Sequence, residues 1–148
     1  MKTINWIFRF LLVMTIVVGG GYAYFDHESK QLSELSDEHL AGHFIALSDG
    51  RTYFELSGPE QGEVVVLVHG FSIPSYLWKP TKQALEGAGY RVLSFDLFGR
   101  GYSDRPISEY GMELYVRQLY ELLKTLELEA QVNLVGMSMG GAVVTHFT

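Results

Sequence analysis

The chain has 148 residues, of which 19% are charged, and a formal net charge of −6 at pH 7. This mildly acidic balance suits a globular surface and argues against nucleic-acid binding, which calls for a basic patch. The sequence contains no cysteine, which excludes a disulfide framework and a thiol nucleophile.

The chain begins with a basic, then strongly apolar segment. Lys2 and Arg9 precede the apolar run 10–25, and acidic residues dominate after it. This charge bias predicts a cytoplasmic N-terminus and an extracytoplasmic domain. The run is about 16 residues, or roughly 24 Å as a helix, against a bilayer core of about 30 Å. Counting from Ile4 gives about 22 residues, which is enough to span the core.

We therefore expect residues 1–25 to be an uncleaved signal anchor. A cleaved signal peptide, with Gly-Tyr-Ala at 21–23 as its cleavage site, is the alternative and would give a secreted or periplasmic protein. A buried core helix is a third interpretation, and it would need tertiary partners.

Residues 26–42 are polar and acid-rich and predict a short stalk. His27, His39 and His43 lie in or beside this segment. Their loose spacing, with neither cysteine nor an ordered pattern of acids, does not indicate a metal site.

Residues 43–148 alternate short apolar runs with helical patterns, which indicates an α/β domain with a mostly parallel sheet. The first two runs flank an Asp-Gly pair and predict an antiparallel lead-in hairpin. The expected strands are 44–47, 52–56, 64–68, 90–95 and 132–135, and the expected helices are 76–86, 114–126 and 142–147.

The most informative stretch is Gly-Met-Ser-Met-Gly-Gly at 136–141, between an expected strand and an expected helix. A serine hydroxyl must protrude to be used as a nucleophile, and a sharp strand-to-helix turn at Ser138 would expose it. Such a turn leaves no room for side chains at Gly136 and Gly140. The N–H of Met139 would then open the helix and face a developing negative charge, as one half of an oxyanion hole.

The second half is expected in the loop after strand 64–68. Gly70 lets the chain turn, and the N–H of Phe71 is the candidate second donor. His69 has two possible roles, as a residue that fixes this loop or as the general base, and the loop-fixing role fits its position better. Asp96, at the end of strand 90–95, is likewise either a triad acid or a residue that caps backbone N–H groups in a glycine-rich loop.

Three ordered motifs, His-Gly-Phe at 69–71, Asp-Leu-Phe-Gly-Arg-Gly-Tyr-Ser at 96–103 and the segment 136–141, resemble the α/β-hydrolase family from residue 44 onward. The pattern is most similar to the esterase, monoacylglycerol lipase and carbon–carbon bond hydrolase branches. Epoxide hydrolases and haloalkane dehalogenases of the family carry aspartate at the elbow, so Ser138 argues against both. The resemblance implies the α/β-hydrolase fold, no metal and no organic cofactor.

In the family the triad acid and histidine follow the serine on later strand-end loops, which here would lie beyond Thr148. His146 is eight residues after Ser138 on the same expected helix, about 12 Å along its axis, and is interpreted as an ordinary helical histidine. We therefore expect 43–148 to be the N-terminal half of a hydrolase domain, truncated after the elbow and inactive alone.

The predicted function of the complete protein is hydrolysis of a carboxylic ester or lipid acyl bond through an acyl-enzyme at Ser138. Cleavage of a carbon–carbon bond or a thioester, and a non-catalytic binding or scaffold role, are the alternatives. The expected partners are a small-molecule or lipid ester and, through the N-terminal segment, a membrane.

Overall fold

The computed structural model describes residues 2–25, 40–129 and 131–148, and the chain divides into two units, residues 1–35 and 36–148. In the first unit, helix α1 spans Lys2–Phe25. Its stretch Trp6–Tyr24 has the length and composition of a membrane span, and none of that stretch is buried. A signal sequence near an N-terminus meets the same criteria of length and composition.

The second unit is built on a five-stranded mixed sheet in the order β1-β2-β4-β3-β5. Its β1–β2 and β2–β4 pairs are antiparallel, and β3 pairs in parallel with both β4 and β5. The strands are β1 His43–Leu47, β2 Gly50–Ser57, β3 Val64–Val68, β4 Arg91–Phe95 and β5 Val132–Gly136. The expected hairpin is present, with Leu47 opposite Gly50 and a two-residue turn between them.

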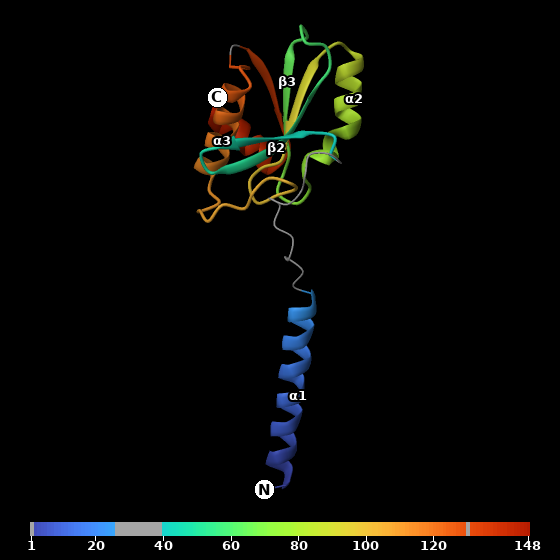
Figure 1. Cartoon of the computed structure of the whole chain (residues 1–148), viewed down its shortest axis with the longest axis vertical. Coiled ribbons are helices and arrows are strands. Elements are labelled where there is room, and N and C mark those ends of the chain that lie inside the picture. The colour runs from blue at the N-terminus through green and yellow to red at the C-terminus, as the bar shows by residue number, and fades with distance from the viewer. Residues whose placement is uncertain (1, 26–39, 130) are drawn as a thin grey trace. The chain divides into compact units, whose positions relative to one another are not determined.

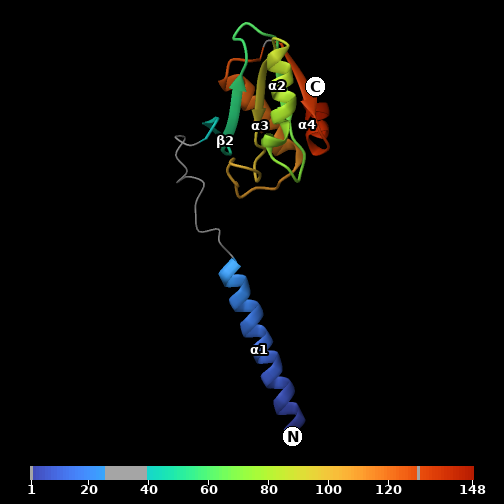
Figure 2. The same ribbon diagram turned by 90° about the vertical axis from the view of Figure 1, so that its right-hand side faces the viewer.

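Helices cover both faces of this sheet, with α2 on one side and α3 and α4 on the other (Figures 1 and 2). Helix α3 spans Met112–Thr125 and α4 spans Met139–Phe147. The helix expected over 76–86 is in fact two elements, the 3₁₀ turn η3 at Ser75–Trp78 and α2 at Lys79–Gly87. Pro80 lies in the first turn of α2, where its missing N–H removes no intrahelical hydrogen bond.

The core follows from the alternation of side chains along the central strands. Val66, Val68, Leu93 and Phe95 pack on the face covered by α3 and α4. The intervening residues pack against Trp78 on the α2 face; they are Val65, Leu67 and Val92. Both faces of β3 and β4 are therefore apolar, as expected for parallel strands covered on both sides. This packing fixes where the carboxyl ends of β3, β4 and β5 meet.

Candidate active site

The turn between β5 and α4 holds Ser138 in a conformation that non-glycine residues rarely adopt. Its backbone has φ 54° and ψ −120°, and the residue is exposed. Two hydrogen bonds close the corner: the Gly140 N–H donates to the Met137 carbonyl at 2.9 Å, and the Gly141 N–H donates to the Ser138 carbonyl at 3.0 Å. Such a conformation costs about 1–3 kcal/mol and persists only where the surroundings enforce it. The Ser138 side chain therefore stands at the exposed corner of a strained turn.

The two glycines beside the serine are sterically required. A Cβ on Gly136 would lie 2.3 Å from the Gly140 carbonyl oxygen, and a Cβ on Gly140 would lie 2.2 Å from the Val68 carbonyl oxygen. These neighbours are backbone atoms, which cannot swing away as a flexible side chain can. The start of α4 thus lies directly on the ends of β3 and β5.

Two backbone N–H groups near the corner have no acceptor among the described residues. One belongs to Met139, the first residue of α4, and the other to Phe71, in the loop after β3. The two loops are in contact, because a Cβ on Gly70 would lie 3.2 Å from Ser138 Cβ. The Met139 N–H also lies at the positive end of the helix dipole. The Ser138 hydroxyl and these two donors, all without a hydrogen-bond partner in the described part of the chain, therefore lie at the ends of two adjacent strands.

His69 is fully buried and uses both ring nitrogens within the loops. Its Nδ1 lies 2.6 Å from the Gly70 carbonyl oxygen, and the Leu97 N–H donates to Nε2 at 2.9 Å. Nε2 is therefore an acceptor and the proton is on Nδ1. Burial lowers the pKa of the imidazole below its ordinary value of 6.5, so the ring is neutral and its 3.9 Å contact with Asp96 Oδ1 is not an ion pair. Neither ring nitrogen is free to accept the Ser138 proton, so the geometry favours the loop-fixing role of His69 over that of a general base.

Asp96, also buried, shapes the loop that follows β4. Its Oδ1 accepts the Ser75 N–H at 2.7 Å and its Oδ2 accepts the Tyr102 N–H at 2.9 Å. Gly101 has φ 49°, and a Cβ there would lie 1.9 Å from Asp96 Oδ2. Because both carboxylate oxygens are engaged by backbone N–H groups, the geometry favours the capping role over that of a triad acid.

Gln118 is a buried polar residue that the sequence interpretation missed. Its amide nitrogen donates to Thr52 Oγ1 at 2.9 Å and to the Asp96 carbonyl at 3.0 Å, and its oxygen accepts the Phe98 N–H at 2.9 Å. The signal was present in the sequence, because Gln118 lies four residues from both Leu114 and Leu122 on the buried side of α3. The amide ties the helix to the loop that begins at Asp96.

The remaining histidines do not complete a triad within the described residues. His146 is exposed on α4, with Nδ1 2.8 Å from the carbonyl of Ala142 on its own helix. His43 begins β1, at the opposite edge of the sheet from β5. His27 and His39 lie outside the described residues. In the described segments, no three of His, Cys, Asp or Glu are grouped so as to hold a metal ion.

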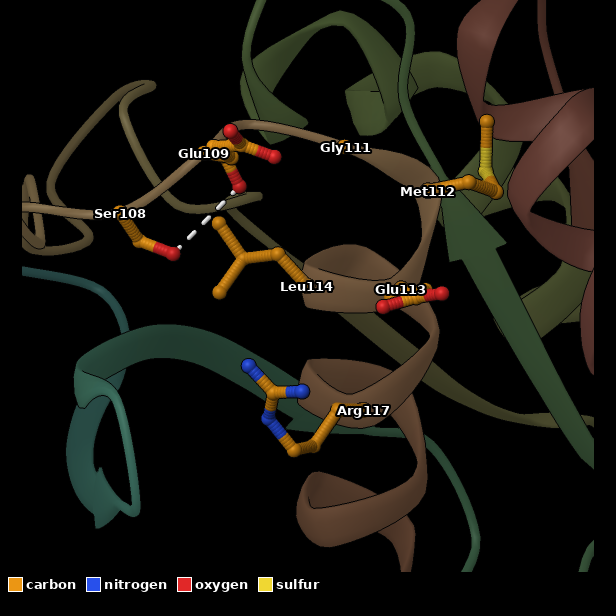
Figure 3. A pocket seen from close by; sticks show the side chains of 7 residues that line it. All are labelled: Ser108, Glu109, Gly111, Met112, Glu113, Leu114 and Arg117. Carbon is orange, nitrogen blue, oxygen red and sulfur yellow. Dashed lines mark hydrogen bonds between the residues drawn. The ribbon is translucent and has the colours of Figure 1, made fainter.

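A cavity of about 420 Å³ opens at the start of α3, away from the serine turn. Figure 3 shows Leu114 between the loop at Ser108 and Glu109 and the side chain of Arg117. The Arg117 Nε donates to Asp49 Oδ2 at 2.6 Å, and this ion pair lowers the pKa of the Asp49 carboxyl. None of the residues predicted for the active site lines this cavity.

Comparison with known proteins identifies the family. Residues 63–148 match the family model described as alpha/beta hydrolase fold, and the chain belongs to that family. The fold and the order of its motifs agree with this assignment, which confirms the resemblance seen in the sequence.

The relatives that match this chain are named for different activities. A putative non-heme chloroperoxidase from Synechocystis sp. is 38% identical over 95 residues, which is 64% of this chain and 33% of the relative. The 2-hydroxy-6-oxo-6-(2'-aminophenyl)hexa-2,4-dienoic acid hydrolase of Metapseudomonas resinovorans is 29% identical over 119 residues, 78% of this chain and 40% of that protein.

Solved structures of enzymes with different names also share the fold of this chain. An esterase from Exiguobacterium antarcticum superposes with a TM-score of 0.67 at 32% identity, over 72% of this chain and 39% of the esterase. An epoxide hydrolase A from Mycobacterium thermoresistibile superposes with a TM-score of 0.66 at 28% identity, over 72% of this chain and 34% of that enzyme. The chain thus spans about a third to two fifths of the length of these relatives.

Proposed function

We propose that the complete protein is a serine hydrolase that cleaves an ester-like bond, with Ser138 as nucleophile. The observation that carries the proposal is the strained corner, which exposes Ser138 close to the loop of Phe71, while the N–H groups of Phe71 and Met139 have no acceptor among the described residues. Family relatives named as an esterase and as the hydrolase of a substituted hexadienoic acid support a hydrolytic reaction.

In the proposed mechanism, a histidine outside these 148 residues takes the proton of Ser138 Oγ, and Oγ attacks the ester carbonyl carbon. The carbonyl oxygen becomes an oxyanion and accepts hydrogen bonds from the Phe71 and Met139 N–H groups. The C–O bond to the alcohol breaks, and the histidinium returns its proton to the leaving oxygen. Water, deprotonated by the same histidine, then releases the carboxylic acid and restores the serine.

Four further residues shape the nucleophile turn and the oxyanion loop without touching the substrate; they are Gly70, Gly136, Gly140 and His69. The glycines allow the two loops to approach each other, and the His69 Nδ1–H donates to the carbonyl of the peptide that carries the Phe71 N–H. No cofactor takes part in the proposed chemistry.

We propose that the substrate carries an apolar acyl group. Large apolar side chains are exposed in the loops around Ser138; they are Phe71 at 63%, Ile73 at 41%, Tyr76 at 71% and Met137 at 37% of their full exposure. Surface of this kind suits a lipid or other apolar ester. We further propose that α1 is a signal anchor that holds an extracytoplasmic hydrolase at the membrane, since its basic residues precede the apolar stretch.

Carbon–carbon bond hydrolysis is the second candidate, favoured by the relative from Metapseudomonas resinovorans. It would use the same serine and oxyanion donors on a ketone, but the leaving group would be a carbon atom that must gain a proton, in place of the alcohol oxygen of an ester. Thioester cleavage and a non-catalytic scaffold role remain alternatives to both.

The test uses the complete protein, with its anchor, in detergent. A fluorophosphonate probe should label the parent and leave Ser138→Ala unlabelled, and the parent should hydrolyse p-nitrophenyl esters while Ser138→Ala does not. The matched control is Thr145→Ala, which removes another hydroxyl from an exposed position on α4 and should keep both activities. Labelling of Ser138→Ala at the parent rate would refute the nucleophile assignment, and an unreactive parent would favour the scaffold.

A further inference from the structure

Arg100 makes two contacts with the residue that carries the proposed oxyanion donor. Its Nε donates to the Phe71 carbonyl oxygen at 2.7 Å, and its guanidinium carbon lies 4.1 Å from the centre of the Phe71 ring. A second nitrogen, Nη1, donates to the Gly99 carbonyl at 2.8 Å. One side chain thus joins the loop after β3 to the loop after β4.

These contacts are not those of an ordinary surface arginine. Arg100 has no carboxylate partner among the described residues, whose ion pairs join other side chains. A planar guanidinium can both stack on a ring and donate along its edge, which a lysine ammonium cannot do. The half-buried Arg100 directs its donors to backbone carbonyls and its face to Phe71.

The two peptide groups on either side of Phe71 are held separately. The first, between Gly70 and Phe71, supplies the donor N–H, and its carbonyl lies 2.6 Å from His69 Nδ1. The second, between Phe71 and Ser72, has its carbonyl held by Arg100 Nε. Since the Phe71 side chain is 63% exposed, packing restrains this residue little. The direction of the Phe71 N–H therefore depends on His69 before it and Arg100 after it.

We propose that Arg100 is a positioning residue for the oxyanion hole, which holds Phe71 so that its N–H meets the developing oxyanion. This inference rests on the proposed function and adds to it a residue that touches neither the nucleophile nor the reacting carbonyl. Without Arg100 the Phe71 N–H is still present, but its direction is held on one side only, by the contact of His69 with the Gly70 carbonyl. A misplacement of about 1 Å in such a site costs up to about 10²-fold in rate.

The experiment compares variants of the complete protein in ester hydrolysis and in fluorophosphonate labelling of Ser138. For Arg100→Ala we expect kcat to fall by about 10- to 100-fold while KM changes by less than about threefold, because the donor acts mainly in the transition state. Arg100→Lys should keep only part of the activity. Millimolar guanidinium should restore part of the lost kcat of Arg100→Ala and should not accelerate the parent.

Arg105→Ala is the matched control, an exposed arginine in the same loop without a hydrogen bond or ion pair to a described residue. It should keep the parent kcat and KM. If Arg100→Ala reacts like this control, or loses activity only through KM, Arg100 does not position the donor. If Arg100→Ala fails to fold, Arg100→Lys decides: a lowered kcat at an unchanged melting temperature supports the inference, and parent kinetics overturn it.

The outcomes separate this inference from the function on which it rests. A parent labelled at Ser138, with Arg100 variants that behave like Arg105→Ala, overturns the role of Arg100 alone. A parent that is neither labelled nor active overturns the hydrolase proposal and the inference together.

Discussion

Gly140→Ala is the substitution for which the structure gives the sharpest expectation. The new Cβ would lie 2.2 Å from the Val68 carbonyl oxygen and 2.5 Å from the His69 carbonyl oxygen, whereas ordinary contacts begin near 3.4 Å. Both neighbours are backbone, so α4 must retreat by about 1 Å from the end of β3. Overpacking of a tight site costs about 1–3 kcal/mol, and we expect about 3 kcal/mol here because neither carbonyl can move alone.

The same retreat would displace Ser138 and the Met139 N–H relative to Phe71, and we expect the rate of ester hydrolysis to fall by about 10²-fold. Gly141→Ala is the matched control, because its Cβ would meet nothing nearer than the Gly136 carbonyl oxygen at 3.5 Å. Alanine is favoured over glycine inside a helix by about 1 kcal/mol, so this control should be as stable as the parent or more so.

Urea unfolding of the complete protein and the rate of fluorophosphonate labelling measure the two effects. If Gly140→Ala matched Gly141→Ala in both, the close approach of α4 to β3 would be wrong, and with it the steric explanation of the turn.

Three further predictions concern residues around the serine turn. Gln118→Leu should lower the free energy of unfolding by about 3 kcal/mol, since it leaves the Phe98 N–H without its acceptor and the buried Thr52 hydroxyl without its donor. The exposed Gln83→Leu should change it little in the same urea titration. Ser138→Gly should raise the free energy of unfolding by about 1 kcal/mol, because glycine accepts the positive φ, while abolishing probe labelling; a less stable variant would count against the strain. Because burial lowers the pKa of His69, the unfolded chain binds a proton more readily than the folded one. Its contribution to stability should be complete above about pH 6.5 and should be lost as the pH falls toward the lowered pKa, so His69→Asn should weaken the acid dependence seen in urea unfolding between about pH 7.5 and about pH 5.5. If the stability of the parent and that of His69→Asn fell equally as the pH is lowered, the lowered pKa of His69 would be contradicted.

The sequence predicted the parts of the fold that depend on local pattern. The uniformly apolar β3 is typical of a strand covered on both faces, and the turn at Asp49 is typical of a tight hairpin. The glycines at 136 and 140 predicted a close strand-to-helix approach, and the structure has backbone oxygens within 2.3 Å of both hypothetical Cβ atoms.

The rest required coordinates, because it depends on contacts between distant segments. Pro80 left the start of α2 open, and only the structure separates η3 from the helix. The two roles weighed for His69 are separated by the Leu97 N–H, which comes from a loop 28 residues away. The contact of Arg100 with Phe71 spans 29 residues and has no sequence pattern of its own.

A crystal structure of the complete protein after reaction with a fluorophosphonate would examine the nucleophile and the oxyanion hole together. We expect a covalent bond from Ser138 Oγ to phosphorus, with the phosphoryl oxygen about 2.7–3.1 Å from the N–H nitrogens of both Phe71 and Met139. A phosphonate attached to another residue, or a phosphoryl oxygen that points away from these two N–H groups, would show that the serine turn is not the catalytic centre proposed for it.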